Sequence, residues 1–300
     1  MSIVVVGSIA LDDVVTQNGS IKNAPGGSSL FFSAAASLFA PVYLVGVVGD
    51  DFPREEIEFL ERRQVNLDGL SIIRGGKTFR WAGEYEIDMN KRRTTNLELN
   101  VFLQFDPVLP DNARRAPYVF LGNIGPQLQM KVLDQVENPK LVALDTMECY
   151  INDNLQALKE VLQRIDLLFI NDSEAQLLAG TPNLMNAARK LLGMGPRYVV
   201  IKKGEHGSML FGDNLFFTVP AYPVENVIDP TGAGDSYAGG AMGYIAMADL
   251  TTPSVLKKAI VYGGLIASFS VQDFSLNALK NTTNTDIEQR MTEFRSLVSF

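Results

Sequence analysis

Short runs of consecutive apolar residues recur along the first two thirds of the chain. The runs are rich in Val, Ile, Leu and Phe, and apolar and polar residues do not alternate within them. Such runs are typical of strands that are buried on both faces, as in a parallel sheet covered by helices. The runs that predict strands are residues 3–6, 42–47, 119–121, 141–144, 167–170 and 198–201.

Between these runs lie segments whose apolar residues recur at the spacing of an α-helix. Because the predicted strands and helices alternate along the chain, the pattern predicts a doubly wound, mainly parallel sheet in a three-layer α-β-α arrangement, within a single domain of residues 1–300. In this fold class ligands bind beyond the carboxyl ends of the strands. The predicted helices cover residues 29–39, 55–63, 154–164 and 184–192.

Two stretches, residues 11–24 and about 68–106, alternate like strands but contain no helical segment. They predict a small antiparallel sheet inserted into the main domain. A sheet that projects from a core can act as a lid that excludes water from a cleft. The same sheet could instead pair two copies of the chain in a homodimer, and the two uses are compatible.

The composition excludes several classes of function. A formal net charge of -8 argues against a nucleic-acid-binding face, which needs clustered Lys and Arg. No apolar run reaches the length of a membrane span, and the chain lacks the basic start of a secretory signal, so we expect a cytoplasmic protein with no membrane partner. One cysteine, Cys149, and one histidine, His206, are too few for disulfides, a tetrahedral zinc site or a Ser-His triad.

The most informative segment is residues 229–240, where a turn containing two glycines leads directly into a predicted helix. Gly232, Ala233 and Gly234 can present backbone N–H groups at the start of this helix, where the helix dipole favours negative charge. Asp235 follows in the first turn. A simple helix cap explains one acidic residue but not the glycines that allow close backbone approach, so the segment predicts a site for a phosphate or a developing oxyanion.

With four further segments, this motif makes the chain resemble the ribokinase-like (PfkB) family of carbohydrate and nucleoside kinases over essentially its whole length. Residues 229–236 are similar to the second signature of the family, and Gly26-Gly27 at the start of a helix is similar to the first. The other segments occur in the family's order: residues 7–12 at the opening strand, 171–174 as an Asn-x-x-Glu segment, and 202–207 as a nucleotide loop.

The resemblance implies ATP-dependent transfer of a phosphoryl group to a hydroxyl of a sugar or sugar derivative. Asp235 would be the general base for that hydroxyl, and the amides of residues 232–235 would hold the transferring group. We expect the positive end of the helix to keep Asp235 ionised, which makes it a weak base. A loose transition state needs little help from the base, so positioning and charge neutralisation would supply most of the rate enhancement.

By the same resemblance, the nucleotide would be bound by Asn171, Glu174, Lys202, Gly204 and Gly207. Glu174 would help to organise Mg²⁺ through water, as is usual for a cation that keeps part of its hydration shell. A strand end followed by a helix cap explains residues 171–174 equally well, and the two uses are compatible.

Asp229 and Thr231 match positions that bind a monovalent cation, K⁺, in some members of the family. The signature itself is compatible with a site that binds the cation and with one that does not.

For the acceptor, the resemblance implies Asp12, Gly26 and Gly27. Asp12 can accept hydrogen bonds from adjacent hydroxyls, and the glycines permit close approach. Phe31 departs from the family pattern, which commonly has Asn there. Its ring could pack the helix against the sheet, or it could join aromatic residues of the inserted sheet on a nucleobase or a sugar face, so a nucleoside kinase is the alternative. Those aromatic residues are Phe79, Trp81 and Tyr85.

The main positive features of the inserted sheet are Arg80 and the cluster Lys91-Arg92-Arg93. Solvation at the surface explains such a cluster, and contact with an anionic acceptor is the alternative. The sequence assigns none of these residues to a site.

Two other classes of function need separate tests. A nicotinamide-dependent oxidoreductase shares the fold class, but the chain lacks a Gly-x-Gly-x-x-Gly turn after its first strand. A non-catalytic regulator that binds sugar or nucleotide would need no general base at Asp235.

Overall fold

A computed structural model describes residues 1–299 and contains a main sheet of nine strands within that range. The strands from β11 to β5 are parallel, and β12 and β13 continue the sheet as antiparallel strands. All six strands expected from the apolar runs are present, so the predicted fold class is confirmed. In spatial order the strands are β13 (Leu215–Val219), β12 (Ser208–Gly212), β11 (Tyr198–Lys202), β10 (Leu167–Asn171), β9 (Leu141–Asp145), β8 (Tyr118–Leu121), β1 (Ile3–Val6), β4 (Val42–Gly49) and β5 (Val65–Ile73).

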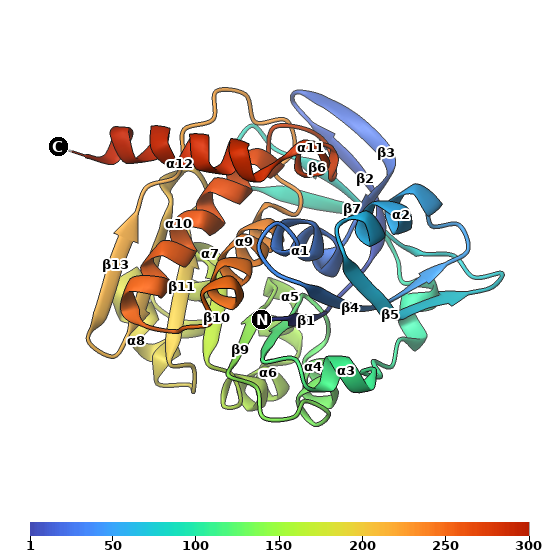
Figure 1. Cartoon of the computed structure of the whole chain (residues 1–300), viewed down its shortest axis with the longest axis horizontal. Helices are drawn as coiled ribbons and strands as arrows, with labels where there is room; N and C mark the ends of the chain where they lie inside the picture. The colour runs from blue at the N-terminus through green and yellow to red at the C-terminus, as the bar shows by residue number, and fades with distance from the viewer. Residues whose placement is uncertain (300) are drawn as a thin grey trace.

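Helices cover both faces of this sheet (Figure 1). Strand β1 shows why, because Ile3 and Val5 pack into one apolar cluster while Val4 and Val6 pack into another on the opposite face. The four predicted helices correspond to α1, α2, α6 and α8. The first face carries α1 (Ser28–Ala36), α2 (Arg54–Arg62), α9 (Ala233–Ala248), α10 (Pro253–Ser270), α11 (Asn277–Asn281) and α12 (Asn284–Val298). The second carries α3 (Asp111–Arg114), α4 (Pro126–Leu133), α5 (Glu148–Asp153), α6 (Leu155–Leu162), α7 (Asp172–Ala179) and α8 (Leu184–Leu192).

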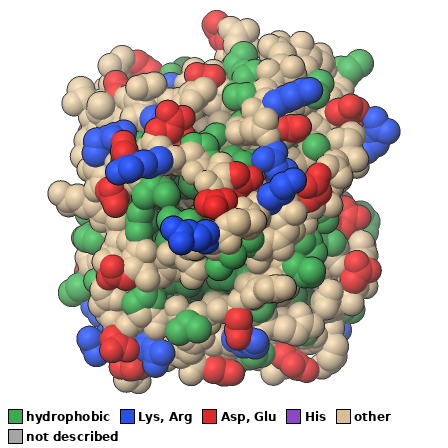
Figure 2. All heavy atoms as spheres, turned by 90° about the vertical axis from the view of Figure 1, so that its right-hand side faces the viewer, with side chains coloured by type: hydrophobic (Ala, Val, Ile, Leu, Met, Phe, Trp, Pro, Cys, Tyr) green, Lys and Arg blue, Asp and Glu red, His purple; other side chains and the backbone are tan. Residues whose placement is uncertain are grey.

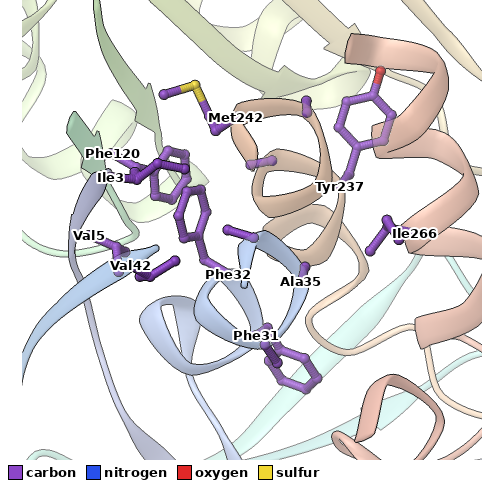
Figure 3. Close-up of a cluster of buried hydrophobic side chains, with 14 of the residues drawn as sticks. Ile3, Val5, Phe31, Phe32, Ala35, Val42, Phe120, Tyr237, Met242 and Ile266 are labelled. Atoms are coloured by element: carbon purple, nitrogen blue, oxygen red, sulfur yellow. The ribbon is translucent and has the colours of Figure 1, made fainter. Parts of the chain in front are cut away.

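Aromatic packing fixes α1 on the sheet. The ring of Phe32 stacks on that of Phe120 in β8, with ring centroids 4.1 Å apart, and both side chains are fully buried. In Figure 3 the neighbouring Phe31 points away from this stack. Met242 of α9 belongs to the same cluster, so α1 and α9 are held side by side over the strands.

The inserted sheet has four strands and is called the small sheet below. Its outer pairs are antiparallel, as expected, but the central pair β2–β6 is parallel. Residues 68–73 were expected here and instead belong to β5, whose place at the edge of the main sheet leaves it partly exposed and gives it the polarity of an inserted strand. The strand order is β3 (Gly19–Gly26), β2 (Ala10–Thr16), β6 (Phe79–Tyr85) and β7 (Arg92–Glu98).

The small sheet stands next to the carboxyl ends of the main strands. Strand β2 begins four residues after β1 ends, and β3 runs directly into α1. Two 3-10 helices, η1 (Asn100–Gln104) and η2 (Gly204–His206), lie in the connections. Among residues 1–299, none of the helices is both long and apolar enough to cross a bilayer.

Candidate active site

The start of α9 forms the turn that the sequence predicts to bind an anion, and it is called the anion-binding turn below. Gly232 has a φ of 73°, a conformation that favours glycine, and any side chain here would overlap the ring of Phe31. The amide of Ala233 donates to the carbonyl of Pro230, and that of Ser236 makes the first bond of the helix, to Gly232. The amides of Gly234 and Asp235 therefore remain at the helix end, where they can bind an anion.

Phe31 lies beneath this turn. Its side chain is 1% exposed and contacts Gly232, so it supports the turn from the core side. Of the two uses considered for Phe31, its burial favours packing over contact with an acceptor.

The carboxyl group of Asp235 lies deep in the site. Among residues 1–299 its buried Oδ1 has no hydrogen-bond partner. Burial and the nearby charge of Asp145 raise its pKa to about 7, against the opposing effects of Lys202 and Arg92. The raised pKa contradicts the expectation that the helix end keeps Asp235 ionised and weakly basic, because desolvation and the charge of Asp145 oppose ionisation. At neutral pH this carboxylate is poised to take up a proton.

Three neighbouring strands of the main sheet end in polar residues. Asp145, Asn171 and Lys202 are the last residues of β9, β10 and β11, and the register places Asn171 directly beside Lys202. The Lys202 ammonium forms an ion pair with Asp145, with side chains that are 15% and 3% exposed. A Cβ atom on Gly234 would lie 3.0 Å from Lys202 Nζ, so the ammonium adjoins the anion-binding turn.

Sequence reasoning missed Asp145. It belongs to none of the family-like segments, although it directly follows the predicted strand 141–144. An acidic residue at the carboxyl end of a buried parallel strand was the available signal.

Asn171 and Glu174 form a complete capping box at the start of α7. Asn171 Oδ1 accepts from the Glu174 amide at 2.8 Å, and Glu174 Oε2 accepts from the Asn171 amide at 3.1 Å. Burial and the charge of Asp145 raise the pKa of Glu174 to about 7. The capping explanation is thus present in the structure, and a role in Mg²⁺ binding stays a prediction.

The predicted nucleotide loop is a tight turn after β11. Gly204 and Gly207 have φ values of 53° and 83°, which favour glycine. The β6–β7 hairpin of the small sheet reaches this loop, because Asn90 Nδ2 donates to Glu205 Oε2 at 2.8 Å. His206 is on the surface with its side chain 75% exposed.

Asp12 lies in β2 of the small sheet and is 5% exposed. A Cβ atom on Gly26 would overlap the Asp12 carboxylate, so Gly26 leaves the room that this side chain occupies, whereas Gly27 allows close approach to the backbone of Ser8 and Ile9. Burial raises the pKa of Asp12 well above its usual value, and the charges of Asp229 and Asp235 add to the increase. Asp12 and Asp235, which are far apart in the sequence, therefore share one site.

Asp229 and Thr231 lie in the loop before α9. Asp229 is 1% exposed, and its two oxygens accept from the amides of Thr231 at 2.8 Å and Ser275 at 3.3 Å. The hydroxyls of Thr231 and Tyr85 are 3.1 Å apart, which links this loop to β6 of the small sheet.

Only one residue of the basic cluster in the small sheet faces the site. Arg80, Lys91 and Arg93 form ion pairs with Asp51, Asp88 and Glu84. The guanidinium of Arg92 instead lies 5.8 Å from the centroid of the Trp81 ring, and its charge helps to lower the pKa values of Asp12, Glu174 and Asp235. Sequence reasoning had no means to separate Arg92 from its neighbours, because only the strand register decides which of them points inward.

Comparison with known proteins gives a family match over most of the chain. Residues 2–283 match the model described as pfkB family carbohydrate kinase. A cytidine kinase of Thermococcus kodakarensis is 31% identical over 247 residues, which cover 80% of this chain and 87% of that protein. A nucleoside kinase of Methanothermobacter thermautotrophicus is 26% identical over 257 residues, which cover 84% and 80% of the two chains.

Solved structures share the fold at low sequence identity. The nucleoside kinase of Methanocaldococcus jannaschii has a TM-score of 0.75 at 19% identity and covers 97% of this chain and 98% of its own. The ribokinase of Arabidopsis thaliana in complex with ribose and ATP has a TM-score of 0.76 at 21% identity, with 96% and 98% coverage. A structure from E. coli that holds ATP and Mg²⁺ has a TM-score of 0.80 at 19% identity, with 97% and 99% coverage.

We expect Asp235→Asn to stabilise the protein at alkaline pH. The carboxyl pKa of about 7 in the folded state is far above its unfolded value of about 3.9, so the stabilising contribution of protonation is present at low pH and is lost as pH rises through 7. Asparagine resembles the protonated form at every pH. Urea unfolding at pH 8 should show a gain of about 2–4 kcal/mol that shrinks towards pH 4.5.

The matched control is Asp213→Asn, at an exposed position in the turn between β12 and β13. It should unfold like the wild type at both pH values. A gain for Asp235→Asn that is the same at pH 4.5 and pH 8 would contradict the assigned pKa.

Proposed function

The chain belongs to the pfkB family of carbohydrate kinases, and from this premise we propose that its acceptor is a nucleoside, phosphorylated on a sugar hydroxyl. Members of the family transfer a phosphoryl group from ATP to an alcohol group of a sugar or sugar derivative, and this chain is such a kinase. The observation that carries the choice of acceptor is the 31% identity to a cytidine kinase over 80% of the chain.

Asp12 and Asp235 have different roles toward the acceptor: Asp12 binds it, and Asp235 is the general base. Asp12 accepts hydrogen bonds from sugar hydroxyls and orients them. Asp235 accepts the proton of the reacting hydroxyl, whose oxygen attacks the γ-phosphorus of ATP while the bond to the bridging oxygen of the β-phosphate breaks and ADP leaves. The amides of Gly234 and Asp235 stabilise the charge of the group in transfer. A pKa of about 7 lets Asp235 act as a base at neutral pH.

The nucleotide lies over the ends of β10 and β11 in this proposal. Lys202 contacts its phosphates, and the turn formed by Gly204 and Gly207 borders it. Glu174 suits Mg²⁺, since its buried carboxylate is an oxygen ligand of the kind that this cation prefers. Bound Mg²⁺ neutralises phosphate charge.

The small sheet offers a surface for the nucleobase. The parallel register places Trp81 beside Asp12, and the antiparallel register places Leu97 beside Trp81, so the three side chains share one face of the sheet. Trp81 is partly exposed and Leu97 is 54% exposed. An apolar platform next to a carboxylate matches a nucleoside, whose flat base adjoins a ring of hydroxyls. A simple sugar would leave the platform uncovered.

We expect Mg-ATP and cytidine to yield ADP, and ribose, fructose and 2-keto-3-deoxygluconate to yield much less, in a coupled assay at pH 7.5. Inosine and uridine in the same panel define the range of bases. Asp235→Asn should lower kcat about 10²- to 10⁴-fold with little change in ATP affinity, because it removes the base and leaves the nucleotide contacts.

The matched variants are Trp81→Ala and Trp81→Phe. Loss of the ring should weaken nucleoside binding by about 1–3 kcal/mol and so raise KM for the nucleoside. KM for ATP should stay unchanged. The Phe variant should retain most of the affinity for the nucleoside. Faster turnover with a free sugar than with every nucleoside would overturn the proposed acceptor. ATP binding without ADP from any acceptor would favour a non-catalytic regulator.

K⁺ at the loop of Asp229 and Thr231 is the second cation of the proposal. Burial raises the pKa of Asp229, and a bound cation would offset the cost of keeping this carboxylate ionised. We expect faster ADP formation in K⁺ than in choline at equal ionic strength. Equal rates of ADP formation in the two salts would contradict a role for K⁺ in the reaction.

The small sheet is also the proposed surface of a homodimer. Its edge strand β7 is exposed along all seven residues, and edge strands readily pair with a second copy. Val15 and Ile87 are 45% and 89% exposed. Figure 2, which views the right-hand side of Figure 1, shows exposed hydrophobic side chains among charged ones.

We expect sedimentation velocity to give twice the mass of one chain, and a Val15→Asp/Ile87→Asp variant to sediment as a monomer. The matched control is Leu297→Asp, which places the same charge at a 60% exposed position on α12. A wild-type monomer, or a double variant that remains dimeric, would rule out this surface.

A further inference from the structure

The ion pair of Asp145 and Lys202 lies at the meeting point of two strand ends and a helix start. Lys202 is the last residue of β11, and Asp145 is the last residue of β9. The Lys202 ammonium would contact a Cβ atom placed on Gly234. Both partners are largely buried. A buried ion pair seldom adds much to stability over an apolar pair, because the cost of desolvation offsets the attraction. Its position beside the anion-binding turn suggests another use.

Asp145 is itself held in place, so it can fix the lysine. Its Oδ1 accepts from the amide of Thr146 at 3.0 Å, and its Oδ2 accepts from Lys202 Nζ. Each carboxylate oxygen therefore has one defined partner. The side chain cannot rotate freely without losing a bond to the backbone.

Lys202 keeps free bonding capacity. An ammonium group has three N–H donors, and among residues 1–299 the only acceptor bonded to Lys202 Nζ is Asp145. Burial favours the neutral amine, but the charges of Asp145 and Glu174 outweigh it and raise the pKa of Lys202. The group is therefore a permanent cation with donors left for an anion in the turn.

We propose that Asp145 is a positioning residue, which holds the Lys202 ammonium against the amides at the start of α9 so that it contacts the phosphoryl group during transfer. The inference rests on the proposed function, since it assigns this task within the same kinase site. Charge develops on the transferring group between nucleotide and acceptor, and a fixed cation there stabilises the transition state without reorganisation. Asp145 touches neither substrate in this scheme: it positions Lys202, and its charge raises the pKa of Asp235.

A double-mutant cycle tests the proposal. We expect Lys202→Met to lower kcat about 10²- to 10³-fold, as loss of one fixed donor does. Asp145→Asn should lower kcat about 10- to 100-fold, because a misplaced group about 1 Å from its position loses that much. Adding Asp145→Asn to Lys202→Met should leave kcat unchanged, since the aspartate then has nothing to position. If Asp145→Asn lowers kcat by the same factor in the wild type and in Lys202→Met, the proposal is wrong. It is also wrong if Asp145→Asn alone leaves kcat normal.

Thermal unfolding separates folding defects from catalytic ones. Lys202→Met leaves Asp145 buried and unpaired, so this variant should melt below the double variant, in which neither charge remains. If the pair served stability alone, the double variant would recover kcat together with its melting temperature. Low kcat in a well-folded double variant supports the proposal.

The pH dependence of kcat/KM gives a readout that a structural role would not move. Lys202 lowers the pKa of Asp235 and Asp145 raises it. The acid limb should therefore shift to higher pH in Lys202→Met and to lower pH in Asp145→Asn. Shifts in the same direction, or none, would contradict the arrangement.

The control pair is Lys140 and Asp249, another Lys–Asp ion pair, at 2.7 Å. Lys140 directly precedes β9, so it lies at the amino-terminal end of the parallel strands, opposite to the end that carries the site. Lys140→Met and Asp249→Asn should leave kcat and the acid limb unchanged. If the wild type prefers an acceptor other than a nucleoside, the proposed acceptor fails, while the cycle can still be measured with the acceptor that reacts.

Discussion

The meeting of parallel strand ends with the start of α9 is the constraint on which the site depends. In a parallel sheet the carboxyl ends of neighbouring strands lie together. Asp145, Asn171 and Lys202 end three such strands, so they converge from separate parts of the chain. The small sheet then closes this edge and brings Asp12 close to Asp235. Carboxylates outnumber cations in this buried space, and the repulsion among them, with desolvation, makes their protonation sensitive to each neighbour.

Much of the fold could be predicted from the sequence, because continuous apolar runs and helical periodicity reflect burial on two faces of a sheet. The turn at Gly232 and the acid at Asp235 were also visible, since their chemistry is local. The raised pKa of Asp235 was not, because it arises from burial in the folded chain and from Asp145, a residue 90 positions earlier. The inward direction of Arg92 and the parallel pairing of β2 with β6 depend on register, which a single sequence does not specify.

Direct contacts connect the small sheet to both halves of the site. Tyr85 reaches Thr231 in the loop before α9, and Asn90 reaches Glu205 in the loop after β11. One hairpin thus touches the segment that carries the base and the segment assigned to the nucleotide. Movement of the hairpin would affect both together, so nucleotide and acceptor are expected to influence each other's binding through it.

The parallel pairing of β2 with β6 has a consequence for how the chain acquires its structure. The two strands are separated in sequence by β3, α1, β4, α2 and β5. Bringing them together closes a loop of more than sixty residues. The conformational entropy that the chain loses on this closure is offset only after the intervening elements have packed. The β2–β6 pairing should therefore form later than the local hairpins β2–β3 and β6–β7. Strands β6 and β7 are more exposed than the fully buried strands β1 and β8, so their amides should exchange with solvent deuterium sooner.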